Sequence, residues 1–141
     1  MNLGPSESFS IPVPLSDRLS LELGEPDSTL RATTVRSGSA VVIRAGGEVD
    51  AANEHTWRGL LREASAVAVR PGPLIVDVTG LDFMGACAFA VLADEAERSR
   101  RRGVTLRLVS SNPGVARVVE ACAFGHVLPV HPTTESALAA A

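Results

Sequence analysis

Two short runs of aliphatic, largely β-branched residues constrain the fold of this chain more than any other feature. The runs lie within Ala40–Ala45 and Leu74–Val78, and each precedes a segment whose apolar residues recur at helical spacing. Runs that are apolar at nearly every position are typical of strands buried on both faces of a parallel sheet. We therefore predict an α/β fold, with a mostly parallel central sheet of four or five strands and about four helices packed on it.

The rest of the chain continues this alternation. Strands are expected at Leu30–Val35, Ala40–Ala45, Leu74–Val78, Val104–Val109 and Val127–Val130, with Thr79–Gly80 turning the chain after the third. The expected helices are one capped by Asp50 or Asn53 and stopped by Pro71, one at Ala86–Arg102, one between Asn112 and Gly125, and one at Pro132–Ala141.

Residues 1–28 differ from the remainder and are predicted to form an N-terminal arm that is partly extended or mobile. The arm contains four prolines and many serines. Its residues Leu19, Leu21 and Leu23 alternate with polar residues, which leaves open a short added strand. Residues 29–141 are predicted to form one domain, as suits a chain of 141 residues.

Charge and composition argue against several classes of partner. The 13 basic and 16 acidic residues give a net charge of −3, which disfavours nucleic acid or an anionic membrane as the main partner. Aromatic residues make up only 4%, too few for a platform that stacks bases. No apolar stretch approaches the roughly 20 residues of a membrane helix. The first ten residues also lack a secretory pattern, so we expect a cytoplasmic protein.

Motifs for catalysis, metals and cofactors are missing from the sequence. It contains no Walker loop, no dinucleotide-binding glycine motif and no zinc-type spacing of Cys and His. Asp77 lies inside a buried strand pattern, where a structural role is the better interpretation. Glu48 and Asp50 end a strand two residues apart, which fits capping and partner contact better than acid–base catalysis. We therefore predict a protein that is not an enzyme and uses no metal or cofactor.

The segment Leu81–Ala88 is the most informative part of the chain. It joins a predicted buried strand to a predicted helix and consists largely of small residues. The free N–H groups at a helix start can receive a partner or an anion, and small side chains let another backbone approach closely. A tight turn that needs small residues only for packing is the alternative.

Several segments in the same order resemble the STAS domain. They are Gly47–Asp50, Val76–Met84, Gly103–Val109, Asn112–Val119 and Val127–Val130. Within this family the chain is most similar to bacterial anti-sigma factor antagonists, in particular those of the sigma-F system in actinobacteria such as mycobacteria. The resemblance runs from about residue 29 to the C-terminus and implies a STAS-type fold.

The resemblance also implies a partner-switching function. Such proteins bind an anti-sigma factor, usually of a small kinase fold, and so release the sigma factor that it holds. Because the carboxyl ends of parallel strands gather at one edge, we expect the partner there. The candidate contact residues are Glu48, Asp50, Asn53, Met84, Gly85, Ala86, Cys87 and Ala88. The oligomeric state stays open, with a homodimer as one option.

Antagonists of this family are commonly switched off by phosphorylation of a Ser or Thr in an Asp-Ser-Ser-Gly-like loop after Phe-Met. The matching stretch here is Gly85–Ala88, with Ala86 at the acceptor position and Gly85 in place of the acidic residue. Because Ala86 has no hydroxyl, phosphate cannot be attached there. The usual control is therefore not expected.

The two cysteines are candidates to replace the phosphate switch. Cys87 follows the lost acceptor near a helix N-terminus, a position that favours thiol reactivity. Cys122 falls on the apolar stripe of the next helix, where burial is expected. A disulfide between them would act as a redox switch, whereas two independent packing thiols are the alternative.

Two other functions also remain open. The chain could be a STAS subunit of a membrane transport system, which would then be separate from the membrane-spanning part. A small thiol-dependent enzyme using Cys87 is the weaker alternative, because the sequence offers no well-placed His and no second vicinal Cys.

Overall fold

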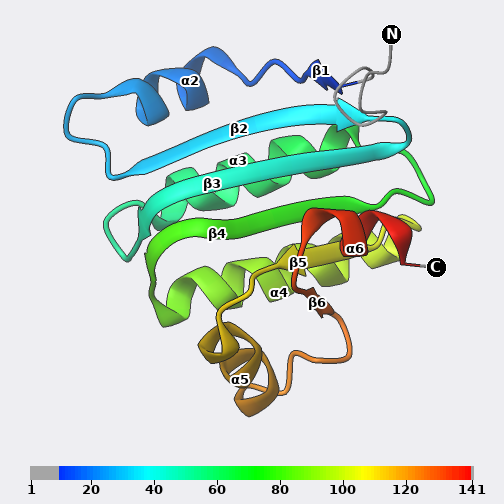
Figure 1. Ribbon diagram of the computed structural model, residues 1–141. Helices are drawn as coiled ribbons and strands as arrows, with labels where there is room; N and C mark the ends of the chain where they lie inside the picture. Colours follow the sequence, from blue (N-terminus) through cyan, green and yellow to red (C-terminus); the bar gives the residue numbers. More distant parts are fainter. Residues whose placement is uncertain (1–9, 141) are drawn as a thin grey trace, which may run out of the picture.

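The computed structural model describes residues 10–140 and contains a six-stranded sheet with helices on both faces (Figure 1). The strands are β1 Ser10–Pro12, β2 Leu30–Ser37, β3 Ala40–Val49, β4 Leu74–Met84, β5 Leu106–Val109 and β6 Val130–His131. The helices are α2 Asp17–Gly24, α3 Glu54–Val67, α4 Ala86–Arg101, α5 Pro113–Ala121 and α6 Thr134–Ala139.

The strands lie in the sheet in chain order, from β1 to β6. The pairs β1/β2 and β2/β3 are antiparallel, and the pairs from β3 to β6 are parallel. The predicted α/β class with a mostly parallel sheet is therefore confirmed. The counts differ slightly, because the described residues form six strands and five helices.

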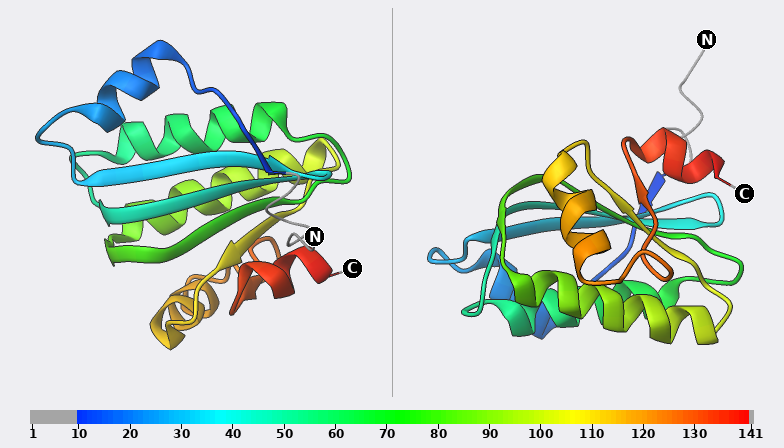
Figure 2. Two further views of the ribbon diagram at one scale, coloured as in Figure 1. Left: turned by 45° about the horizontal axis from the view of Figure 1, so that its top comes forward. Right: turned by 90° about the horizontal axis from the view of Figure 1, so that it is seen from below.

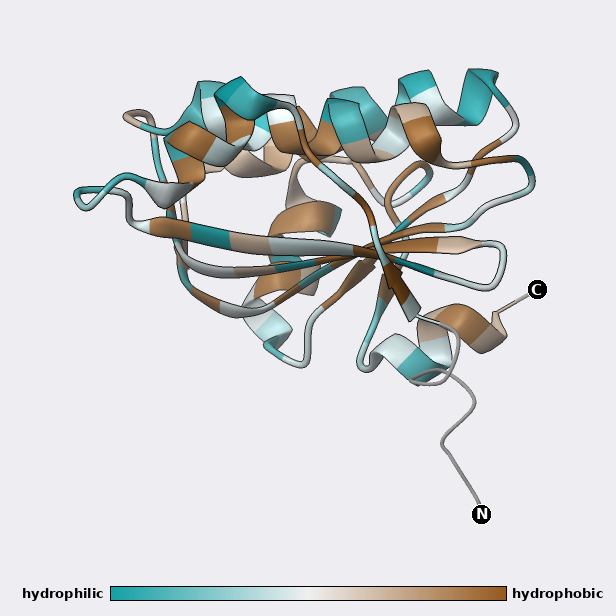
Figure 3. Ribbon diagram, turned by 90° about the horizontal axis from the view of Figure 1, so that it is seen from above, coloured by the Kyte–Doolittle hydropathy of each residue, from teal (hydrophilic) through white to brown (hydrophobic). Residues whose placement is uncertain are grey.

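The sheet separates two apolar layers of unequal size. Helices α2, α3 and α4 cover one face and α6 lies on the other, with the hydrophilic residues of the helices turned outward (Figure 2, Figure 3). Along β3, Val41 and Ile43 belong to the larger layer and Val42 to the smaller one. The smaller layer is completed by Ile75, Val109 and Ala137. Both faces of β3 are thus buried, as the continuous apolar run predicts.

The predicted N-terminal arm contains a helix where a strand was considered. Ser16 caps α2 by accepting a hydrogen bond from the Leu19 N–H, and Leu19 is only 1% exposed. Leu15 and Leu23 also pack on the core, whereas Leu21 is 71% exposed. The decisive spacing is therefore four residues, from Leu15 to Leu19 to Leu23, and not the alternation of every second residue. Residues 1–9 of the arm lie outside the described residues.

Strand β4 continues to Met84 instead of turning at Thr79–Gly80. Its register with β3 shifts twice: Arg44 pairs with Asp77 but Gly46 pairs with Gly80, and Gly47 pairs with Leu81 but Glu48 pairs with Phe83. Each shift adds one residue to β4, as in a β-bulge. A Cβ at Gly80 would lie 2.8 Å from the carbonyl oxygen of Ala45. Gly80 therefore permits the close approach of the two strands and does not mark a turn.

The last two predicted strands are shorter than expected. β5 begins at Leu106, and β6 contains only Val130–His131. Val127 and Leu128 form a turn instead, in which both N–H groups donate to the carbonyl oxygen of Phe124, 3.0 Å away. Both side chains are still buried in the larger layer, so their apolar character reflects core packing without strand pairing.

Arg102 follows α4 but stabilises the end of α3. Its guanidinium donates to the hydroxyl of Ser65 at 2.8 Å and to the carbonyl oxygen of Ser65 at 2.9 Å. The Ser65 hydroxyl is also 3.0 Å from that of Ser99 on α4. Arg102 therefore satisfies a carbonyl in the last turn of α3 and joins the two helices, while Gly103 ends α4 with a φ of +82°.

We predict that Arg102→Ala lowers the free energy of unfolding by about 1 to 2 kcal/mol, because hydrogen bonds from a charged donor to a buried hydroxyl and a helix-end carbonyl are lost. Urea denaturation measures the change. The control is Arg101→Ala, which should alter the same quantity by no more than about 0.5 kcal/mol. Equal stability of the two variants would show that the Arg102 contacts do not stabilise the fold.

Candidate functional site

The ends of β3 and β4 bring the two predicted contact segments side by side. In the sheet, Glu48 pairs with Phe83 and Val49 with Met84. The Gly85 N–H then donates to the carbonyl oxygen of Val49 at 2.9 Å. We call the surface formed by Glu48–Asn53 and Phe83–Ala88 the strand-end surface.

A glycine fixes the approach of β3 to this surface. Gly47 has a φ of +94°, and a Cβ there would lie 1.9 Å from the carbonyl oxygen of Thr29. The next residue, Glu48, donates its backbone N–H to that same oxygen at 2.9 Å. The Glu48 side chain is exposed, so it is available to a partner.

Asp50 and Asn53 hold the loop between β3 and α3. One Asp50 carboxylate oxygen accepts from the Ala52 N–H at 3.0 Å, and the Asn53 side-chain oxygen accepts from the Asp50 N–H at 3.0 Å. The Asn53 side-chain amide donates to the Glu48 carbonyl oxygen at 2.9 Å. Asn53 occupies the N-cap position of α3, but its side chain makes no capping bond to that helix. Both residues thus position the loop and are only partly exposed.

The first turn of α4 is anchored from inside the protein. Trp57 on α3 is fully buried, and its indole N–H donates to the carbonyl oxygen of Ala88 at 3.2 Å. Ala88 is itself fully buried. A partner therefore cannot reach the Ala88 side chain, although the sequence made it a candidate contact.

The remaining residues of this turn are accessible to different degrees. Ala86 is exposed, and Met84, Gly85 and Cys87 are partly exposed. Gly85 is the N-cap of α4 and has no side chain with which to cap it. The start of this helix therefore presents small side chains and backbone, as predicted for Leu81–Ala88, although residues 81–84 belong to β4.

Phe83 also lies on this surface, although it is not among the contact residues predicted from the sequence. It is 52% exposed near the end of β4, beside the small residues that begin α4. The shift in register between Gly47 and Glu48 determines which way the residues after Leu81 face. Gly47 permits such a shift, but a glycine also suits a turn, so the exposure of Phe83 could not be predicted from the sequence.

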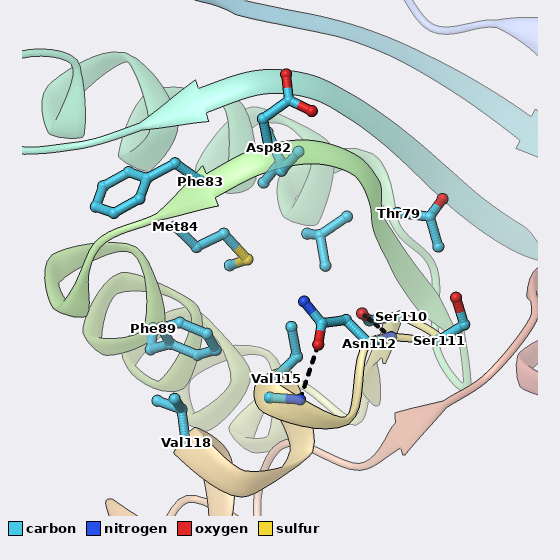
Figure 4. A pocket seen from close by; sticks show the side chains of 13 residues that line it. Thr79, Asp82, Phe83, Met84, Phe89, Ser110, Ser111, Asn112, Val115 and Val118 are labelled. Carbon is cyan, nitrogen blue, oxygen red and sulfur yellow. Dashed lines mark hydrogen bonds between the residues drawn. The ribbon is translucent and has the colours of Figure 1, made fainter.

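A cavity of about 240 Å³ opens beside the strand-end surface (Figure 4). Its walls come from the second half of β4, from Phe89 on α4, and from the loop between β5 and α5 together with α5 itself. Asn112 caps α5 as predicted, because its side-chain oxygen accepts from the Gly114 N–H at 2.9 Å. Phe83 and Met84 line this cavity and also belong to the strand-end surface.

Cys87 and Cys122 are both free thiols, and their surroundings differ. Cys87 is partly exposed in the first turn of α4. Cys122 is exposed, so the expectation that it is buried is wrong. Helix α5 ends at Ala121 and Cys122 is its C-cap, with its N–H donating to the Val118 carbonyl oxygen at 3.0 Å. The apolar stripe of the helix therefore stops one turn earlier than the sequence indicates.

Two ionisable groups with a shifted pKa lie outside the strand-end surface. Burial lowers the pKa of His131 on β6, and the Arg107 guanidinium lowers it further. On α4, a hydrogen bond from Arg100 lowers the pKa of Glu97. Within residues 10–140, no three His, Cys, Asp or Glu side chains are grouped so that they could hold a metal ion.

The sequence of residues 31–137 matches the family model of the STAS domain. The chain belongs to the STAS domain family. It is 62% identical over 138 residues to a protein of Mycobacterium tuberculosis with the provisional name anti-anti-sigma factor Rv2638, a match that covers 98% of this chain and 93% of that protein. It is also 53% identical over 138 residues to the anti-sigma-F factor antagonist RsfA of Mycobacterium tuberculosis, covering 98% of this chain and 99% of RsfA.

Solved structures share the fold of this STAS domain. An anti-sigma factor antagonist from Mycobacterium paratuberculosis superposes with a TM-score of 0.69 at 22% identity, over 82% of this chain and 96% of that one. The Bacillus cell fate determinant SpoIIAA, in its phosphorylated form, gives a TM-score of 0.58 at 20% identity, over 76% of this chain and 96% of that one. In the described part of this STAS domain, no helix is long and apolar enough to cross a membrane.

Proposed function

We propose that this protein is an anti-sigma factor antagonist, which binds a kinase-fold anti-sigma factor in the cytoplasm and thereby releases the sigma factor bound to it. The observation that carries the proposal is the identity of 53% and 62%, over 138 residues, to two Mycobacterium tuberculosis proteins named for this role. The second of them, RsfA, is named as an antagonist of the anti-sigma-F factor, so that factor is the first partner to test.

The strand-end surface is the proposed docking site. It combines an exposed apolar residue, Phe83, with an exposed acidic residue, Glu48, and with the small residues that begin α4. Aromatic residues are common anchors of protein interfaces, and small residues let a partner backbone approach closely. We assign direct contact to the exposed residues, and we assign to Asp50 and Asn53 the positioning of the loop beside them.

The proposed antagonist is not regulated by phosphorylation at the usual position of the family. The position carries Ala86, whose side chain is exposed but has no hydroxyl. A phosphate would add about two negative charges at this point. An antagonist with Ala86 therefore needs another off signal, or it stays active.

We predict that Ala86→Glu weakens binding to the anti-sigma-F factor of Mycobacterium tuberculosis at least about tenfold, because the exposed carboxylate places charge and bulk in the docking site. Calorimetry with the purified proteins measures the affinity, with RsfA as the positive control. The matched control is Ala90→Glu, at an exposed position one turn further along α4.

Two results would contradict this part of the proposal. Unchanged affinity of Ala86→Glu, with the fold intact by circular dichroism, would remove the docking site from the start of α4. Failure of the wild-type chain to bind, while RsfA binds in the same assay, would overturn the proposed function itself. A bound anti-sigma factor should also release its sigma factor, which gel filtration of the mixture detects.

We further predict that the anti-sigma factor attaches no phosphate to the wild-type chain. Incubation with the purified factor and ATP, followed by mass spectrometry, tests this. The double variant Gly85→Asp/Ala86→Ser restores the acidic residue and the acceptor hydroxyl of the family pattern and shows whether the kinase reaches the loop. Stoichiometric phosphate on Thr79 or on any serine of the wild type would mean that phosphorylation still controls the protein.

The two cysteines supply the proposed alternative switch. Both are accessible free thiols, Cys122 more so than Cys87. A disulfide would form by loss of two protons and two electrons to an oxidant such as a peroxide or a glutathione disulfide. In a reducing compartment such a bond is typically transient and reports oxidation. The bond would tie the first turn of α4 to the end of α5 and change the docking site, so the reduced protein is the proposed active form.

We predict that the wild type binds the anti-sigma factor more tightly with reductant than after oxidation, whereas Cys122→Ser binds equally in both conditions. The expected difference for the wild type is at least about fivefold, roughly 1 kcal/mol. Calorimetry of both proteins in both conditions measures it. Equal affinity in all four cases would leave Cys87 and Cys122 as independent thiols.

A further inference from the structure

Strand β4 extends several residues beyond the end of its pairing with β5. Leu74–Asp77 pairs with Leu106–Val109 of β5, and the pairing ends there, although β4 runs on to Met84. The other side of β4 stays paired with β3 as far as Met84. Within the described residues, Val78–Met84 therefore presents one side that no strand covers, which we call the open side of β4.

The cavity of about 240 Å³ lies between this open side and α5 (Figure 4). Its apolar lining includes Val78, Leu81, Met84, Phe89, Val115 and Val118 in addition to Phe83. A cavity of about 150 Å³ is enough to admit a benzene ring. The space therefore suffices for one bulky apolar side chain.

Asn112 places a hydrogen-bond donor at the rim of this cavity. Its side-chain oxygen is fixed by the bond from the Gly114 N–H at 2.9 Å, so the amide nitrogen points the other way. Figure 4 shows that nitrogen directed toward the cavity, and no acceptor among the described residues bonds to it. The open rim thus offers an N–H donor suited to a carbonyl oxygen.

These features fit an extended peptide segment better than a small molecule. An uncovered strand side pairs with another backbone, and pockets beside it take alternate side chains of the added segment. Phe83 and Met84 line the cavity and also belong to the strand-end surface. The cavity is therefore continuous with that surface, and a protein docked on the strand-end surface can also contact the cavity.

We propose that the β4–α5 groove, formed by the open side of β4, the apolar cavity and Asn112, receives an extended segment of the anti-sigma factor. The segment lies along Val78–Met84, one of its carbonyl oxygens accepts from the Asn112 amide, and one of its bulky apolar side chains fills the cavity. The proposal rests on the proposed function, and it adds a second contact region on a different helix, α5.

Two substitutions test the groove and leave the strand-end surface unchanged. Val118→Phe fills the cavity from α5, with Ala116→Phe as the matched control, because Ala116 is exposed on the same helix and does not line the cavity. Asn112→Ser removes the amide donor but keeps a residue type that caps helices. We expect Val118→Phe to weaken binding to the anti-sigma-F factor at least tenfold and Asn112→Ser about fivefold, with Ala116→Phe equal to the wild type.

Hydrogen exchange gives a measurement on the unaltered protein, which holds even if Val118→Phe fails to fold. The backbone amides of Val78–Met84 should exchange more slowly in the complex than in the free chain. The groove proposal is overturned if these amides are not protected, or if Val118→Phe and Asn112→Ser fold and bind as the wild type does while Ala86→Glu binds weakly. Absence of wild-type binding would instead overturn the proposed function.

Discussion

The parallel pairing of β3 with β4 is the constraint on which the rest of the structure depends. These two strands supply the centre of the sheet, and both segments of the strand-end surface continue directly from them. Their close approach requires glycine at Gly80, where a Cβ would lie 2.8 Å from the Ala45 carbonyl oxygen, and a Cβ at Gly47 would meet the carbonyl oxygen of Thr29, just before β2. The two register shifts occur beside these glycines, so the same local geometry that permits pairing also sets the direction of Phe83.

The layers of this fold could be predicted from the sequence because buried positions are occupied by apolar residues. Strands buried on both faces read as continuous apolar runs, and Asn112 followed by Pro113 marks a helix start without any tertiary contact. The failures arise where one local pattern has two meanings. Gly80 suits a turn as well as a bulge, and only the nearby Ala45 carbonyl decides between them.

The position of the candidate site in the fold could be predicted from the sequence, but the solvent exposure of its side chains could not. Strand ends of a parallel sheet must gather at one edge, so Glu48–Asn53 and Met84–Ala88 were expected together. Which of these side chains faces solvent depends on packing that the sequence does not express. Ala88 is buried and accepts a hydrogen bond from Trp57, whereas Cys122, the C-cap of α5, is exposed. The division of the chain at residue 28 and the roles of the contact residues stay predictions.

The hydrogen bond from Trp57 to the Ala88 carbonyl oxygen has a consequence for the thermodynamics of association. A loop that orders only when its partner arrives must lose conformational entropy at that moment, which weakens binding. Here a fully buried side chain has already fixed the first turn of α4, so that loss occurs during folding. The surface at the start of α4 is therefore preorganised. The backbone at the start of α4 is already fixed in the free protein. Substitutions of the exposed residues there can therefore change which partner is recognised while the backbone stays in place.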